Sequence, residues 1–138
     1  MKKYKIGYTT GVYDMFHIGH LNILRRAKEQ CEYLIVGVTT DELCAERKNK
    51  MPIICLEERM AIVEAIKYVD KVVPQKDMDK FKAVKEYKAD AVFVGSDWQG
   101  TPDWQEYEKQ FNSLGCSVVY LKHTDGISST ALREKCGK

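Results

Sequence analysis

One stretch decides the fold that we expect for this chain: Gly11-Val12-Tyr13-Asp14-Met15-Phe16-His17-Ile18-Gly19-His20. It follows an apolar run at residues 4–8, which is typical of a buried strand, and it precedes apolar residues at helical spacing over residues 21–31. The stretch therefore connects a strand to a helix. Its glycines, Gly11 and Gly19, suit a tight turn or a close approach of the backbone to a ligand.

Two histidines lie at the expected start of this helix. His17 and His20 are three residues apart, so their side chains fall on one side of the first turn. A helix start offers unpaired N–H groups and a partial positive charge, which favour a phosphate. Histidines at this spacing can also cap or pack, so the local pattern leaves a phosphate site and a structural role both open.

The alternation of strands and helices continues along the chain. The expected strands are residues 4–8, 33–38, 71–74, 91–94 and 117–121. The expected helices are a short one capped by residues 39–42, then residues 57–69, 79–88 and 103–114, and a last one after residue 126. Residues 46–50 lack apolar periodicity and predict an exposed loop. We expect an α/β fold in a single domain, residues 1–138, with a Rossmann-like parallel sheet of about five strands and helices on both faces.

Three segments follow expected strands and should therefore meet. In a parallel sheet, ligands bind in the crevice beyond the carboxyl ends of the strands. Residues 11–20, 95–100 and 123–130 each follow a strand. The topology alone predicts that these three segments line one crevice.

Composition excludes several classes of protein. The 22 basic residues are interleaved with 20 acidic ones for a net charge of +2, which argues against a large nucleic-acid surface. The five cysteines are scattered without C-x-x-C spacing, so we expect neither a disulfide framework nor a zinc site. No apolar run approaches the length of a membrane span, and the first residues lead into a strand and not a signal-peptide core. We expect a cytoplasmic protein that binds no membrane.

A second segment far along the chain points to a family. Ser128-Ser129-Thr130 opens an expected helix, and such residues alone are usually N-caps. Together with His17-Ile18-Gly19-His20 they resemble the nucleotidyltransferase superfamily of the H-x-G-H type, and within it the glycerol-3-phosphate cytidylyltransferase family. The matching pieces are 11–20, 33–42, Arg59, 67–70, Gly95, 97–100, Thr124 and 126–128. Phosphocholine and phosphoethanolamine cytidylyltransferases are similar too.

The resemblance implies a reaction and a set of site residues. The reaction is transfer of CMP from CTP to a small phosphorylated alcohol such as glycerol 3-phosphate, with release of pyrophosphate, giving a CDP-alcohol for a cell-surface polymer or lipid. It also implies Mg²⁺ carried with the nucleoside triphosphate, no protein-bound metal, and a homodimer. The implied catalytic residues are His17, His20 and Lys48; the nucleotide-binding residues are Val12, Tyr13, Asp14, His17, His20, Lys67, Asp97, His123, Thr124, Gly126, Ile127, Ser128, Ser129 and Thr130; the acceptor-binding residues are Lys48, Lys50, Arg59 and Trp98.

Several of these assignments have alternatives. Lys48 and Lys50 also fit a solvated charge run, Arg59 also fits a surface residue, and Trp104 and Tyr107 are better placed for core packing than for a substrate wall.

The chain also departs from the family pattern at three places. It has His123 and Lys67 where the family carries arginine, and residues 100–110 form a longer stretch than expected. These departures leave open an adenylyltransferase of the same superfamily and another phosphorylated acceptor, including a sugar or polyol phosphate. A nucleotide-sensing module is a third alternative, although both histidines and the hydroxyl cluster are present. A tRNA synthetase fragment also carries His-Ile-Gly-His, but this chain has no K-M-S-K-S-like loop.

Overall fold

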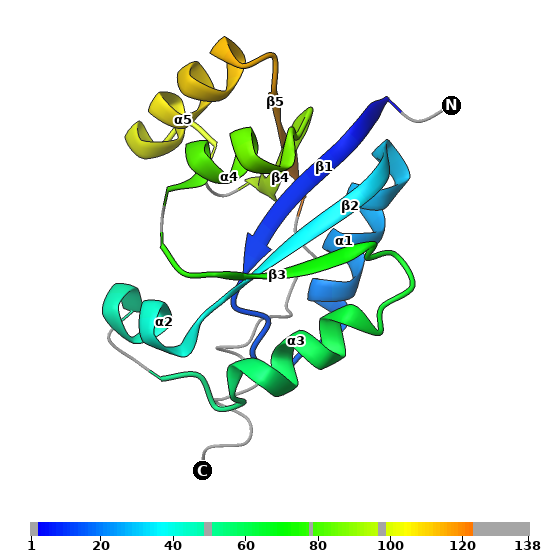
Figure 1. Cartoon of the computed structure of the whole chain (residues 1–138), viewed down its shortest axis with the longest axis vertical. Helices are drawn as coiled ribbons and strands as arrows, with labels where there is room; N and C mark the ends of the chain where they lie inside the picture. The colour runs from blue at the N-terminus through cyan, green and yellow to red at the C-terminus, as the bar shows by residue number, and fades with distance from the viewer. Residues whose placement is uncertain (1–2, 49–50, 78, 97–98, 123–138) are drawn as a thin grey trace.

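The computed structural model describes residues 3–48, 51–77, 79–96 and 99–122, with the side chains of residues 47 and 48 outside this description. Its centre is a five-stranded sheet, parallel throughout, in the order β3-β2-β1-β4-β5 (Figure 1). The strands are β1 (Tyr4–Gly11), β2 (Cys31–Thr39), β3 (Lys71–Gln75), β4 (Ala91–Gly95) and β5 (Ser117–Leu121). The predicted α/β fold with a parallel sheet of about five strands is therefore confirmed.

Helices cover both faces of the sheet. They are α1 (Ile18–Gln30), α2 (Asp41–Lys48), α3 (Leu56–Glu64), α4 (Lys80–Tyr87) and α5 (Pro102–Ser113). The buried residues of α1 and α3 pack on one face, and those of α4 and α5 pack on the other (Figure 1). Each of these helices has an apolar stripe that must be buried against another layer, which is why the sheet lies between two helical layers.

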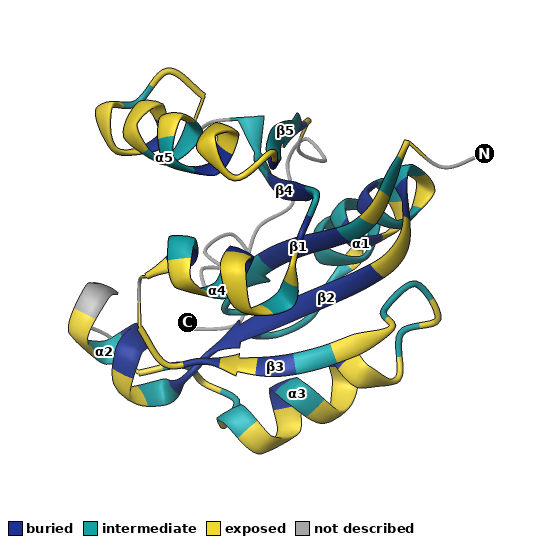
Figure 2. Ribbon diagram, turned by 45° about the horizontal axis from the view of Figure 1, so that its top comes forward, coloured by how far each residue is buried: buried dark blue, intermediate teal, exposed yellow. Residues whose placement is uncertain are grey.

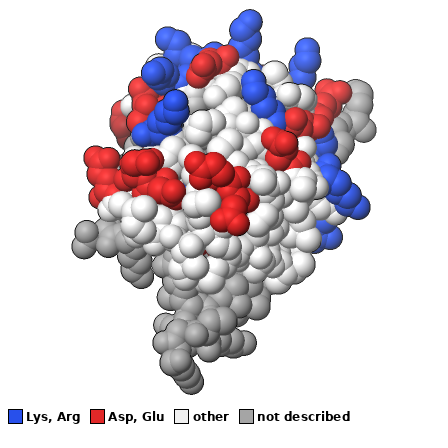
Figure 3. Space-filling view, turned by 60° about the horizontal axis from the view of Figure 1, so that its bottom comes forward, with Lys and Arg blue, Asp and Glu red and all other residues white. Residues whose placement is uncertain are grey.

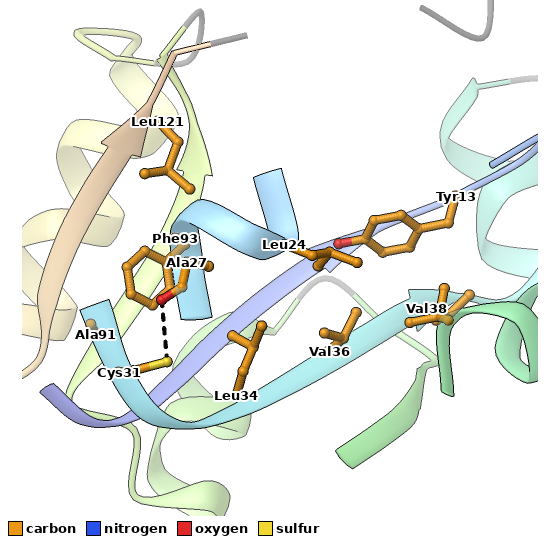
Figure 4. Close-up of a cluster of buried hydrophobic side chains, with 11 residues drawn as sticks. Tyr13, Leu24, Ala27, Cys31, Leu34, Val36, Val38, Ala91, Phe93 and Leu121 are labelled. Carbon is orange, nitrogen blue, oxygen red and sulfur yellow. Dashed lines mark hydrogen bonds between the residues drawn. The ribbon is translucent and has the colours of Figure 1, made fainter. Parts of the chain in front are cut away.

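The core lies on both sides of the central strands, which Figure 2 shows as largely buried. On the first face, Leu24 and Ala27 of α1 lie over Leu34 and Val36 of β2 and Phe93 of β4 (Figure 4). Full burial of each such aliphatic or aromatic side chain contributes about 1.5–3 kcal/mol to the free energy of unfolding.

The second face is packed by aromatic side chains of α5. Trp104 and Phe111 of α5 are 7% and 0% exposed and pack with Val84 of α4 and Val92 of β4. Tyr107, one turn along α5, is partly buried against the same cluster. Core packing of Trp104 and Tyr107, which the helical spacing favoured, is confirmed.

Three boundaries differ from the sequence prediction. Residues 46–48 belong to α2 and not to a loop. The helix is capped by Thr40, whose Oγ1 accepts a hydrogen bond from Leu43 N, and it continues through the charged residues. The helix expected over residues 57–69 ends at Glu64, and tighter turns follow in which Ile66 N bonds to Val63 O. The periodicity misled there because Ile66 and Val69 still pack on the core. Cys31, expected in the first helix, is the first residue of β2.

The strand order fixes where a ligand can bind. The chain builds β2 and β3 on one side of β1 and then places β4 and β5 on the other side. This reversal creates a crevice beyond the carboxyl ends of β1 and β4, which is the usual ligand site of such sheets. The loop from Gly11 to His17 leaves β1 at this point.

The described surface carries charges of both signs. Acidic and basic side chains are intermingled on the face shown in Figure 3. None of the helices in the described residues combines the length and apolarity that a membrane crossing requires.

Candidate active site

The loop that joins β1 to α1 has a strained backbone. Tyr13 and Met15 have φ angles of 56° and 50°, in the left-handed region that bulky side chains rarely adopt. The Tyr13 ring is buried and lies over Gly11, where a Cβ atom would be only 2.9 Å from it. Figure 4 shows this ring pointing toward Leu24 of the core. Such strain persists only where packing fixes it, so the loop is a preorganised support for His17.

Asp14 ties the same loop to the segment before α3. Its side chain is buried, and its two carboxylate oxygens accept hydrogen bonds of 2.9 Å from the backbone N–H groups of Ile53 and Ile54. A buried carboxylate requires partners of this kind. Asp14 therefore supports the loop, and its contact with a nucleotide stays a prediction.

His17 and His20 cap the start of α1 reciprocally. His17 is the N-cap, and its Nδ1 accepts a hydrogen bond of 3.0 Å from Gly19 N. In return, Nδ1 of His20 accepts a hydrogen bond of 3.2 Å from His17 N. The two rings stack with their centroids 3.9 Å apart. The shared side of the first turn, expected from the spacing, is confirmed, and the capping role that the spacing left open is present as well.

These hydrogen bonds fix which ring nitrogen of each neutral histidine carries its proton. A neutral imidazole has one acceptor and one donor nitrogen, and in both rings Nδ1 is the acceptor. The Nε2 atoms of His17 and His20 therefore carry N–H groups. Nε2 of His17 is buried and has no hydrogen-bond partner among the residues that the structure describes. An unpaired buried donor at a helix start is suited to a phosphate oxygen.

Both histidines are held in the neutral form. Burial, together with the neighbouring His17 and against an opposing effect of Asp14, lowers the pKa of His20 to about 4. The rings of Tyr13 and Phe16 are each 5.3 Å from that of His20. Burial also lowers the pKa of His17. At neutral pH the pair can therefore donate hydrogen bonds but supplies no net positive charge.

This lowered pKa predicts a loss of stability in mild acid. As pH falls below 6.5 the unfolded chain binds a proton at residue 20 before the folded chain does, so the folded state loses stability between pH 6.5 and about 4. We expect the free energy of unfolding to fall by about 2 kcal/mol from this residue between pH 7 and pH 5. Urea unfolding at both pH values measures it. His20→Gln keeps a capping residue at this position, so its free energy of unfolding should fall less than that of the wild type between pH 7 and pH 5. An equal fall in the two proteins would contradict the lowered pKa of His20.

Arg59, which the resemblance places at the acceptor substrate, lies inside the fold, and its contact with the acceptor stays a prediction. Arg59 is 1% exposed and its guanidinium donates to the carbonyl oxygens of Val12, Thr39 and Ile54 at 2.7–2.8 Å and to the Asp41 carboxylate at 2.5 Å. It joins the site loop, the end of β2, the start of α2 and the start of α3. Arg59 is therefore a structural clamp, with four of its five N–H donors engaged within the fold.

Lys67 lies away from the crevice of its own chain, and its contact with a nucleotide stays a prediction. Lys67 lies on the connection that leads into β3, so it is at the amino ends of the strands, whereas the crevice is at the carboxyl ends. Its side chain is exposed, with Nζ 5.3 Å from the centre of the Tyr68 ring. The resemblance suggested a ligand contact there, but the direction of a parallel strand places the residue at the opposite edge.

Val12 and Tyr13 lie in the described loop after β1, where their contact with a nucleotide stays a prediction, and the remaining predicted contacts lie outside the described residues. They are the side chain of Lys48 and residues Lys50, Asp97, Trp98, His123, Thr124, Gly126, Ile127, Ser128, Ser129 and Thr130. The strand ends that precede them are described: β4 ends at Gly95 and β5 ends at Leu121, beside each other at the carboxyl edge.

One buried cation near this edge was not anticipated from the sequence. Lys80, the first residue of α4, is 7% exposed, and its Nζ is 3.4 Å from Oγ1 of Thr10 at the end of β1. Lysines at helix starts are normally solvated, so no sequence signal distinguished it. Within the described ranges, no three His, Cys, Asp or Glu side chains are grouped so as to hold a metal ion.

Comparisons with known proteins agree with this geometry. Residues 8–135 match the family model described as cytidylyltransferase-like. The glycerol-3-phosphate cytidylyltransferase of Staphylococcus aureus is 39% identical over 128 residues, which cover 92% of this chain and 91% of that protein. The enzyme of the same name from Bacillus subtilis is 37% identical, with coverage of 92% and 93%. The crystal structure of a lipopolysaccharide core biosynthesis protein from Thermoplasma volcanium matches with a TM-score of 0.72 at 30% identity, covering 88% of this chain and 97% of that one.

Proposed function

The chain belongs to the cytidylyltransferase-like family, and from this premise we propose that it transfers CMP from CTP to glycerol 3-phosphate. An oxygen of the acceptor phosphate bonds to the α-phosphorus of CTP. The bond from that phosphorus to the oxygen bridging to the β-phosphorus breaks, and pyrophosphate leaves with the electron pair. The reaction needs no protein nucleophile, so catalysis consists of positioning the substrates and stabilising the charge that develops.

The observation that carries this proposal is the histidine pair at the start of α1. Two neutral imidazoles are fixed with their Nε2–H groups as donors, and one of these donors is buried with its hydrogen-bonding capacity unused by the described residues. In the proposed complex they donate to phosphate oxygens that gain charge as pyrophosphate departs. Because the loop and the helix cap already hold the rings, little reorganisation accompanies the reaction.

Other parts of the proposal rest on the family resemblance. We place Lys48, Lys50 and Trp98 near the acceptor, and Asp97 with residues 123–130 near the nucleotide. Mg²⁺ is proposed to arrive bound to the triphosphate, where it offsets charge on the leaving pyrophosphate. The histidines do not fit as its ligands, because their Nδ1 atoms accept backbone hydrogen bonds and their Nε2 atoms carry protons. A homodimer in the cytoplasm is proposed on the same basis.

Pyrophosphate release tests the proposed reaction. With Mg²⁺ present, we expect release from CTP with glycerol 3-phosphate, no comparable release from ATP, and none after chelation with EDTA. Phosphocholine, phosphoethanolamine and polyol phosphates serve as competing acceptors. Release from ATP alone would move the chain to the adenylyltransferases. Release from CTP with a different acceptor would keep the cytidylyl transfer and reject glycerol 3-phosphate.

A further inference from the structure

Three aromatic rings enclose the imidazole of His20 at the start of α1. The His17 ring stacks on it with the two centroids 3.9 Å apart. The Tyr13 ring meets it edge-on and the Phe16 ring is tilted against it, each with 5.3 Å between centroids. The centroids of the Tyr13 and Phe16 rings are 6.2 Å apart. His20 is therefore surrounded by rings of the loop that precedes it, and Phe16 forms one side of this enclosure.

Tyr13 and Phe16 are held in the fold in different ways. Tyr13 is 5% exposed, has a left-handed backbone with φ of 56°, and lies over Gly11, so its replacement would disturb the loop itself. Phe16 is partly buried at the edge of the core on the α1 side, and its backbone is outside the left-handed region. The effect of Phe16 on the histidine pair can therefore be separated from the support of the loop.

The hydrogen bond between the two histidines depends on the protonation of His20. Nδ1 of His20 accepts a hydrogen bond of 3.2 Å from the backbone N–H of His17. In an imidazolium both ring nitrogens carry protons, so Nδ1 would become a donor. Two donors cannot face each other at this distance, so the ring would turn away and the reciprocal cap would open. The charge on His20 therefore decides whether the cap is held together.

The same cap holds the buried donor of His17. Nε2 of His17 has no hydrogen-bond partner among the residues that the structure describes. The ring is fixed by the hydrogen bond from Gly19 N to Nδ1 and by the stacking on His20. If His20 turned away, His17 would lose its stacked partner and the acceptor of its backbone N–H. Its Nε2–H would then lose the fixed direction that stabilisation of a transition state requires.

The groups around His20 have opposing effects on its charge. Burial and the neighbouring His17 lower the pKa of His20, whereas the Asp14 carboxylate raises it. Tyr13 is also titratable, but burial raises the pKa of its hydroxyl, so it stays neutral. The strands that pack against α1 contribute apolar side chains to this core, namely Leu34, Val36, Val38, Phe93 and Leu121. Because Asp14 favours the charged form, His20 stays neutral only while its enclosure outweighs Asp14.

We propose that Phe16 is a positioning residue for the histidine pair: its ring shields His20 from water, which keeps Nδ1 of His20 an acceptor and thereby holds the Nε2–H donor of His17 in place. The expected effect on the reaction rate rests on the proposed cytidylyl transfer, whereas the effect on His20 is measured without any substrate. Phe16 acts through His20 and needs no contact with a reacting group. A polar side chain at residue 16 should therefore make activity fail at a higher pH.

NMR of protein labelled with ¹⁵N-histidine measures the enclosure directly, and His20→Gln identifies the His20 signals. The wild-type ring should be in the Nε2–H form at neutral pH and titrate at about pH 4. Phe16→Gln should raise this midpoint by about one pH unit or more. Phe16→Leu keeps an apolar side chain and should titrate as the wild type does. The matched control is Tyr4→Gln, because Tyr4 is partly buried at the edge of the same core and its ring packs on Phe93.

The wild type alone offers a measurement that does not depend on the folding of any variant. The chemical shift of the His17 backbone amide proton should change with the same midpoint as the His20 ring, because that proton loses its acceptor when the ring is protonated. An amide shift that stays constant while the ring titrates would overturn the inference.

The pH dependence of pyrophosphate release tests the consequence for His17. In Phe16→Gln the ratio of kcat/KM at pH 5 to that at pH 8 should be about 2- to 10-fold below the wild-type ratio, and Phe16→Leu and Tyr4→Gln should keep the wild-type ratio. The inference is overturned if Phe16→Gln leaves the His20 midpoint unchanged, if Tyr4→Gln raises it equally, or if the midpoint rises without a change in the ratio. A wild type that is inactive with CTP and every acceptor overturns the proposed function, and the NMR titrations then decide the role of Phe16 by themselves.

Discussion

Replacement of His17 by asparagine is expected to lower kcat by about 100- to 1,000-fold with little change in stability. Asparagine is a favourable N-cap, and its side-chain oxygen can accept the hydrogen bond that Gly19 N now donates to Nδ1 of His17. It has no atom that corresponds to Nε2. The substitution therefore removes the buried donor and keeps the helix cap, which separates the proposed catalytic role of His17 from its structural one.

The measurement is pyrophosphate release under saturating substrate, together with the melting temperature of each variant. His17→Ala is the control, because it removes both the donor and the cap and should also lower the free energy of unfolding by about 1 kcal/mol. If His17→Asn kept most of the wild-type kcat, Nε2 of His17 would not contact the transition state and the proposed nucleotide site would be misplaced.

Replacement of Arg59 by methionine is expected to destabilise the fold strongly. Methionine fills a similar volume, but the Asp41 carboxylate and the carbonyl oxygens of Val12, Thr39 and Ile54 lose their donor. Removing one partner of a fully buried ion pair costs about 3–5 kcal/mol, and because the Asp41 side chain is 22% exposed we expect the lower end of that range. For a chain of this size that corresponds to a fall in melting temperature of about 10 °C or more.

The melting temperature of Arg59→Met distinguishes a structural role of Arg59 from a contact with the acceptor substrate. A residue that only bound the acceptor would raise KM and leave the melting temperature unchanged. The combined variant Arg59→Met with Asp41→Asn provides the control, since removing both charges should destabilise by less than the sum of the single changes. An Arg59→Met protein with wild-type stability would show that the clamp contributes nothing and would restore the substrate role.

The amino-acid sequence was sufficient to predict the features that depend on the order of residues along the chain. Alternating apolar runs and helical stripes specify a parallel sheet between two layers of helices, because each element must bury its own apolar surface. The spacing of His17 and His20 places both at the first turn after β1, and the structure has them there. Sequence order also indicates where Lys67 lies: a residue shortly before a strand is at the amino edge of a parallel sheet, away from the crevice.

Tertiary structure alone decided the roles that depend on distant partners. Arg59 became a clamp because Val12, 47 residues away, and Asp41 converge on it in the fold. The histidines are neutral because the Tyr13 and Phe16 rings exclude water from His20, an effect that spacing does not encode. Lys80 is buried because α4 and the end of β1 meet there. Local periodicity thus determined where the chain turns, whereas burial and long-range contacts determined which polar side chains hold the fold and which face the crevice.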